Sequence, residues 1–292
     1  MSPDRESQGT AAATVRTIPG RTPLVFDSPH SGTRYPEDFA FSCDFSLLRT
    51  AEDTHVEKLY DFAPELGIAW IEALFPRSYL DANRGEHEVD VEMLDGAWEG
   101  EVVTDPVALS KVRLGKGLVW KNTDTGEPMY TRQLRPQEVR DRIQRCWRPY
   151  HAAVQRAIEE AHARHGFSMH LNCHSMPSIA GSHATDYPGI AHADFVIGDR
   201  DGSTADPRLT AQLAQFLRDR GYDVEVNFPY KGVELVRRYG DPAGQRHSIQ
   251  VEVNRKLYMD EATFELLPSA PALRENLRAM AQWLLEVDPR RL

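Results

Sequence analysis

A long amphipathic helix that leads directly into an alternating strand is the feature that most limits how this chain can fold. Across 135–166, apolar residues recur at steps of three and four from Val139 to Ile158, and Gly166 follows as a typical C-terminal residue. In 167–174 (FSMHLNCH), apolar and polar residues then alternate with the period of a strand. A helix followed by a strand in this way is typical of α/β proteins.

The order of strands and helices continues on both sides of these segments. We expect strands at 23–32, 193–199, 222–229 and 247–254, and helices at 52–67, 207–221 and 271–287. Pro149 should bend the long helix, and a T-x-x-E capping box from Thr54 to Glu57 should begin the helix at 52–67. The pattern predicts a single α/β domain with helices on both faces of its sheet.

Three segments lie outside this regular pattern. Residues 1–20 are rich in Ser, Ala, Thr and Gly and are expected to form a disordered lead-in, which leaves 21–292 as the domain. The segment 69–84 is predicted to form two short strands, or one strand and an extended turn. The segment 85–122 has no clear period, and we expect it to be a long excursion near the active site.

Composition excludes several classes of function. The formal net charge of −10 argues against a general nucleic-acid or anionic-membrane binder. Three scattered cysteines without a CxxC spacing indicate reduced thiols. The N-terminus has no apolar signal-peptide core, and no apolar run reaches the ~18 residues of a membrane span. We therefore expect a soluble cytoplasmic protein, and the sequence leaves its oligomeric state open.

Two histidines lie where a predicted strand runs into a loop, His30 in PHSG and His174 in CHSM. Such positions converge at the carboxyl ends of strands, where open α/β sheets bind ligands. Two histidines and one carboxylate, with a fourth position left for water, form a common catalytic zinc site. Each histidine could instead be buried and bonded to the backbone. The candidates for the third ligand are Asp53 and His55, although Asp53 could also cap a helix.

Charged residues suited to catalysis and substrate binding lie in three other segments. Glu252 is on the polar face of 247–254, where it could move a proton from water to the leaving amine, or be salt-bridged. Arg77 and Arg84 flank YLDAN and could pair with a substrate carboxylate, and Asn83 could add a neutral hydrogen bond.

A second basic group lies in YKGVELVRRYG, at Lys231, Arg237 and Arg238. It could simply be a solvated surface. If the substrate has a second carboxylate, however, a second cationic partner is needed. We therefore expect Lys231 and Arg238 to bind that carboxylate.

In order along the chain, six segments resemble the N-formylglutamate amidohydrolase family: PLVFDSPHSG, EDTHVEKLYDFAPELG, PRSYLDANR, CHSMPS, YKGVELVRRYG and IQVEVNRKLYMDE. The resemblance runs from about residue 20 to 265. It implies a single domain akin to zinc carboxypeptidases and aspartoacylases, with a mixed and mostly parallel sheet and one zinc ion. The implied substrate is a small anionic N-acyl amino acid, with N-formylglutamate, an intermediate of histidine degradation, as the first choice.

The resemblance also implies roles for individual residues. His30, Asp53 and His174 would hold the metal. Glu252 would act as general base and then general acid. Arg77 would polarise the scissile carbonyl and stabilise the oxyanion. Formate and glutamate would be the products.

The D-x-N-R element of the family falls on Asp81, Asn83 and Arg84, and in the wider superfamily it grips the substrate carboxylate. One position departs from the family pattern, because Asn172 stands where the family more often has Asp. By strand alternation, Asn172 shares a face with His174. A contact beside the metal site is therefore neutral instead of charged, a change that can alter metal affinity.

Two alternatives remain beside the N-formylglutamate hypothesis. The same catalytic residues could act on another N-acyl amino acid or on a small peptide. The chain could also be a binding protein that retains the fold without catalysis.

Overall fold

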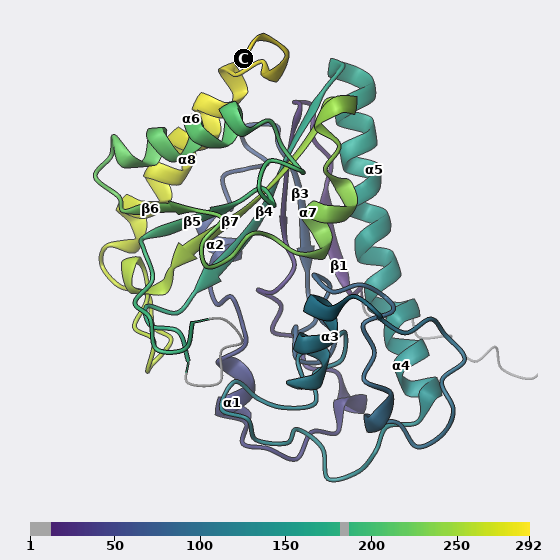
Figure 1. The fold of residues 1–292 in the computed structure, drawn as a ribbon. Helices are drawn as coiled ribbons and strands as arrows, with labels where there is room; N and C mark the ends of the chain where they lie inside the picture. The colour runs from purple at the N-terminus through teal and green to yellow at the C-terminus, as the bar shows by residue number, and fades with distance from the viewer. Residues whose placement is uncertain (1–12, 182–186) are drawn as a thin grey trace, which may run out of the picture.

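The computed structural model describes residues 13–181 and 187–292, and a seven-stranded sheet runs through its centre (Figure 1). Its strands are β1 (Val15–Ile18), β2 (Leu24–Ser28), β3 (Ala69–Ala73), β4 (Ser168–Met176), β5 (Phe195–Gly198), β6 (Val224–Val226) and β7 (Arg246–Asn254). Their order across the sheet is β1-β3-β2-β4-β7-β5-β6.

The sheet is mixed and mostly parallel, as predicted. Strands β3, β2, β4 and β7 run parallel to one another. The edge strand β1 is antiparallel to β3, and β5 is antiparallel to β7, while β6 runs parallel to β5. The carboxyl ends of the four central strands therefore meet at one edge of the sheet, where polar side chains can converge.

Helices cover both faces of the sheet, which also confirms the predicted architecture (Figure 1). The helices are α1 (Phe45–Arg49), α2 (Val56–Leu59), α3 (Pro106–Arg113), α4 (Pro136–Arg142), α5 (Arg148–His165), α6 (Pro207–Arg218), α7 (Glu234–Tyr239) and α8 (Ala270–Glu286). One apolar core joins the sheet to α2, α6 and α8, and the other joins it to α4 and α5. Within the described residues, no helix is both long and apolar enough to cross a membrane.

The long predicted helix is present but contains a π-helical turn. Helix α4 runs into π-helical residues Ile143–Trp147, and α5 continues to His165, before the left-handed Gly166. Pro149 has no N–H to donate, and its ring would clash with the carbonyl oxygen four residues earlier. The extra residue of a π turn immediately before Pro149 accommodates both effects.

Two sequence predictions need correction. The helix expected at 52–67 is only the short α2, and its N-cap is His55 with a left-handed φ of 68°. The predicted capping box is absent there, because the Thr54 hydroxyl lies 3.4 Å from Glu52 Oε2 and does not cap the helix. The expected lead-in lies partly in residues 1–12, which are outside the described residues. From Val15 the chain is already paired with β3, so the boundary at residue 20 is too late.

The segment 69–84 forms one strand, β3, followed by turns. The segment 85–122 leaves the sheet and then returns toward Asp81. Figure 1 shows α1 and α3 below one end of the sheet. The returning part of 85–122 is buried at Leu118 and Trp120. The backbone N–H of Asp81 donates to the carbonyl of Leu118 at 2.8 Å. The segment 85–122 is therefore tied by its backbone to Asp81.

On the face of the sheet toward α5 and α7, the central strands present buried polar side chains. His170, Asn172 and His174 of β4 lie beside Ser248, Gln250 and Glu252 of β7, in register. Apolar residues of the same strands fill the opposite face. Buried polar groups are costly unless they are hydrogen-bonded, so this layer must be internally satisfied.

Candidate active site

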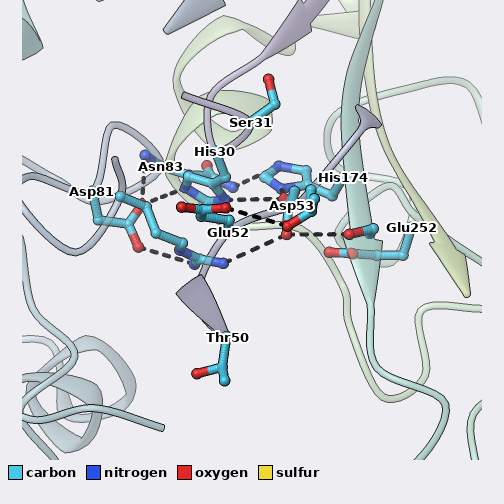
Figure 2. Close-up of polar contacts among 12 residues, drawn as sticks. His30, Ser31, Thr50, Glu52, Asp53, Asp81, Asn83, His174 and Glu252 are labelled. Carbon is cyan, nitrogen blue, oxygen red and sulfur yellow. Dashed lines mark hydrogen bonds and ion pairs between the residues drawn. The ribbon is translucent and has the colours of Figure 1, made fainter. Parts of the chain in front are cut away.

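The side chains of His30, Asp53 and His174 converge at the carboxyl ends of β2 and β4, and all three are buried (Figure 2). One potential ligand atom from each lies within 4.8 Å of the others. Asp53 Oδ2 is 2.9 Å from His174 Nδ1 and 3.3 Å from His30 Nδ1. Sequence reasoning placed both histidines at strand ends, and the structure brings them together with the aspartate.

The ring nitrogens of both histidines are suited to hold a metal ion through Nδ1. His30 Nε2 lies 2.7 Å from Asp81 Oδ1, and His174 Nε2 lies 2.7 Å from Asn172 Oδ1. If these oxygens accept an Nε2–H, Nδ1 of each ring is left to bind a metal ion. His174 Nδ1 lies 2.9 Å from Asp53 Oδ2, and Asn83 Nδ2 lies 3.1 Å from His174 Nε2. His30 Nδ1 is buried and has no hydrogen-bond partner, because its contact with Asp53 lacks hydrogen-bond geometry.

The donor set of two imidazoles and one carboxylate fits zinc, with a fourth position available for water. The pKa of Asp53 would be raised by burial, but the hydrogen bond with His174 Nδ1 and the charges of His174 and His30 outweigh burial and hold it well below its usual range. Asp53 is therefore an anion at neutral pH. His30 Nδ1, which is buried without a hydrogen-bond partner, faces the anionic Asp53 Oδ2. A dication bound between them would be a partner for both atoms.

The backbone explains why Asp53, and not His55, is part of this cluster. The Asp53 N–H donates to the His30 carbonyl at 3.0 Å, which ties the two loops together. The left-handed conformation of His55 turns its ring away, toward the Phe264 carbonyl 2.8 Å from Nε2. Arg255 supports the loop by donating to the Glu52 carbonyl at 2.7 Å.

Glu252 lies on β7 directly opposite His174 on β4. Its Oε1 accepts a hydrogen bond of 2.8 Å from Gln250 Nε2. Burial, with the negative charge of Asp53 nearby, raises the pKa of Glu252 to about 7, although His174 and Arg77 oppose the shift. A carboxyl group with a pKa near neutrality, beside a candidate metal centre, can take up and release a proton.

Arg77 extends between two of the acidic groups. Its Nη2 donates to Asp81 Oδ2 at 3.0 Å, and its Nη1 lies 4.0 Å from Asp53 Oδ1. The guanidinium carbon is 5.0 Å from the centre of the Trp120 ring, whose Nε1 lies 3.3 Å from Asp81 Oδ2. Burial would raise the pKa of Asp81, but the charges of His30 and Arg77 hold it well below the usual range.

The three named residues of the D-x-N-R element, Asp81, Asn83 and Arg84, contact different parts of the site. Asp81 orients His30, and Asn83 is buried with its Oδ1 accepting from the Leu235 N–H at 2.9 Å. Arg84 keeps spare donors, since its Nε has no partner and its nearest ion pair, with Glu88, spans 3.8 Å. Of these three, Arg84 is the residue with hydrogen-bonding capacity left for a substrate carboxylate.

The second basic group is engaged elsewhere. Lys231 Nζ lies 2.8 Å from Asp201, and this pair is largely exposed. Arg238 donates to buried Glu234 at 2.7 Å, and Arg237 pairs with the same carboxylate at 2.6 Å. The expectation that Lys231 and Arg238 bind a second carboxylate thus finds no free cation there, because Asp201 pairs with Lys231, and Glu234 of the same segment pairs with Arg238.

Sequence reasoning missed other residues beside the site. Arg255 follows β7, and its Nη2 lies 3.5 Å from Asp53 Oδ1; its position just after a strand end was the available signal. Lys116 Nζ lies 3.6 Å from the centre of the Trp120 ring and 2.5 Å from Asp124. Both Lys116 and Trp120 lie in the segment 85–122, where no period marked them.

Comparison with known proteins shows the family. The model of the N-formylglutamate amidohydrolase family matches residues 22–259. The N-formylglutamate deformylase of Pseudomonas aeruginosa is 30% identical, over 91% of this chain and 92% of that protein. The corresponding protein of Pseudomonas putida is 29% identical, over 90% and 94%.

A solved structure gives the same result. The crystal structure of N-formylglutamate amidohydrolase from Ralstonia eutropha JMP134 superposes with a TM-score of 0.89 at 41% identity, and it covers 96% of this chain and 100% of its own. The family match spans most of the chain, including all three residues of the His30–Asp53–His174 cluster. This chain therefore belongs to the N-formylglutamate amidohydrolase family.

Proposed function

We propose that this protein hydrolyses the amide of N-formyl-L-glutamate, releasing formate and glutamate, and that the reaction depends on one zinc ion held by His30, Asp53 and His174. The observation that carries the proposal is the buried position of Glu252 beside this cluster, with its pKa raised to about 7. The names of the relatives support the substrate, and the donor set supports the metal.

Each polar group in the cluster has a distinct part in this proposal. A dication bound at these ligands would act as a Lewis acid toward the formyl carbonyl and lower the pKa of water. Glu252 takes the proton from the attacking water and delivers it to the nitrogen of the leaving glutamate. Arg77, held by Asp81, donates hydrogen bonds to the oxyanion that develops as the carbonyl carbon becomes tetrahedral.

The substrate is a small anionic amino acid derivative, so a guanidinium partner is required. Arg84 is our choice for a carboxylate of the substrate, because its Nε is buried without a partner. We assign Asn83 to the support of the metal-site layer, since its side chain is buried among Leu235, Asn172 and Gln250.

Zinc content and substrate preference test the proposal together. We expect about one zinc ion per chain by elemental analysis, and glutamate release from N-formylglutamate that a chelator abolishes and zinc restores. A panel of N-formyl and N-acetyl amino acids then fixes the substrate. Faster turnover of an N-acyl amino acid with one carboxylate would favour the alternative substrate class. Bound zinc without turnover of any of them would favour a binding protein.

A further inference from the structure

We propose that Asp27 is a positioning residue, which holds the amide of Asn172 in the one orientation that leaves Nδ1 of His174 free for a metal ion. The inference rests on the proposed metal-dependent function and extends it one residue beyond the ligand contacts.

A continuous chain of hydrogen bonds links the two residues to the metal ligand. Asp27 on β2 and Asn172 on β4 are paired across the sheet, and Asn172 Nδ2 donates to Asp27 Oδ1 at 2.9 Å. The other end of the same amide, Asn172 Oδ1, lies 2.7 Å from His174 Nε2. All three side chains are almost completely buried, so water cannot take the place of either contact.

The orientation of the Asn172 amide decides which ring nitrogen of His174 carries the proton. With Oδ1 toward the ring, Nε2–H can donate to it, and Nδ1 keeps its lone pair for a metal ion. The Asn83 amide nitrogen lies 3.1 Å from the same Nε2, and it can donate instead to Asn172 Oδ1 and Gln250 Oε1, each 3.4 Å away. If the amide were turned over, its NH2 would face Nε2 and favour hydrogen on Nδ1, where the metal would bind. Asp27, when ionised, can only accept hydrogen bonds. The reversed amide would place Asn172 Oδ1 against Asp27 Oδ1, and two acceptor oxygens repel each other. The carboxylate of Asp27 therefore favours the orientation in which Asn172 Oδ1 faces His174.

Asp27 has the partners needed to stay ionised although it is fully buried. Its Oδ1 lies 2.9 Å from His170 Nε2, and its Oδ2 accepts a hydrogen bond of 2.6 Å from the Tyr150 hydroxyl. His170 is held in turn by the Ser248 hydroxyl, 2.7 Å from Nδ1. Burial would raise the pKa of Asp27, but the charge of His170 and the three side-chain hydrogen bonds lower it overall.

Compared with a carboxylate at position 172, the carboxylate of Asp27 lies one hydrogen bond farther from His174. A carboxylate at position 172 would contact His174 directly, whereas here the carboxylate of Asp27 acts on His174 through a neutral amide. This predicts that the two positions can exchange their chemistry. A carboxylate is required at one of them, and an amide at the other.

The test is a charge-swap cycle read out as zinc affinity. The proteins are wild type, D27N, N172D and D27N/N172D, and Zn2+ affinity is measured by competition with a chromophoric chelator. D27N frees the amide of Asn172 to turn over, so we expect zinc binding about 10- to 100-fold weaker. N172D alone places two carboxylates side by side, and a lower Tm is expected. In the double variant, the new carboxylate accepts from His174 and from the new amide, so affinity returns to within about threefold of wild type.

Two further measurements separate positioning from a general loss of structure. D199N is the matched control, because Asp199 is also buried and accepts hydrogen bonds from Asn227 and the Gly202 N–H. It should lose stability without losing zinc affinity. Histidine 15N spectra of the zinc-loaded proteins should show His174 protonated on Nε2 in wild type and the double variant.

The outcomes distinguish this inference from the function on which it rests. If wild type binds zinc and D27N binds it equally well, Asp27 does not position the ligand. A double variant as weak as D27N would overturn the exchange of roles. Failure of the wild type itself to bind zinc would overturn the proposed metal-dependent function, and this inference with it.

Discussion

Glu252 and His174 occupy paired positions in β7 and β4, and their side chains project from the same buried face of the sheet. The register therefore fixes a carboxyl group beside a candidate metal ligand without any loop between them. Sites built on strands are held more precisely than sites built on loops. The same burial raises the pKa of Glu252 to about 7, which suits a group that must both accept and donate a proton.

Replacing Glu252 with Gln should abolish turnover while zinc remains bound. The amide keeps the shape of the side chain but cannot accept the proton of water, so we expect kcat to fall by at least about 10²- to 10⁴-fold. Glu57→Gln is a matched control, because burial also raises the pKa of Glu57 to about 7, but in α2 and outside the cluster. Glutamate release and zinc content check both variants. Retained activity in E252Q would remove Glu252 from the mechanism.

The same substitution should stabilise the metal-free protein at alkaline pH. The folded-state pKa of Glu252 lies above its ordinary value of 4.5, so the folded state binds the proton more tightly. Its contribution to stability is thus complete below about pH 4.5 and is lost as pH rises through about 7. The loss corresponds to about 3 kcal/mol. Urea unfolding of metal-free wild type and E252Q should give similar stabilities at pH 5 and a more stable E252Q at pH 8.5. A pH-independent difference would contradict this.

The sequence placed His30, His174 and Glu252 at one end of the sheet because regular elements carry them. His30 follows β2, while His174 and Glu252 alternate on the polar faces of β4 and β7, so a period of two and a shared sheet edge were sufficient. The choice between Asp53 and His55 depended on the left-handed φ of His55, a single dihedral angle that no pattern indicates.

The roles of the charged residues depended on contacts that the hydrophobic pattern does not indicate. Arg238 looks available in YKGVELVRRYG, but the turn of α7 places Glu234 beneath it. Asp81 looked like a substrate contact, but the fold directs it to His30. Periodicity reports which face of an element is buried, whereas ion pairing depends on tertiary packing. Strands and helices were therefore easier to predict than the partners of individual charges.

Arg84 and Arg238 should differ sharply when each is replaced by Gln. Arg84 has a buried Nε without a partner, whereas Arg238 is paired with Glu234. R84Q should raise KM for N-formylglutamate by roughly 10-fold or more, since a charge-assisted contact is worth about 1.5–3 kcal/mol. R238Q should leave KM near the wild-type value. Steady-state kinetics decide, and the reverse ranking would return the substrate carboxylate to the group at 231–238.

Arg77 should affect catalysis more than substrate binding. Its guanidinium is anchored by Asp81 and lies against Trp120, which leaves Nη1 directed toward the metal-ligand cluster, 4.0 Å from Asp53. If Arg77 stabilises the oxyanion, R77A should lower kcat by about 10²- to 10³-fold, with a smaller change in KM. Because the side chain is partly open to solvent, millimolar guanidinium should enter the vacated space and restore part of the activity. The same concentration should have no effect on wild type. Loss of zinc from R77A, or a loss confined to KM, would show that Arg77 supports the ligands or binds the substrate instead.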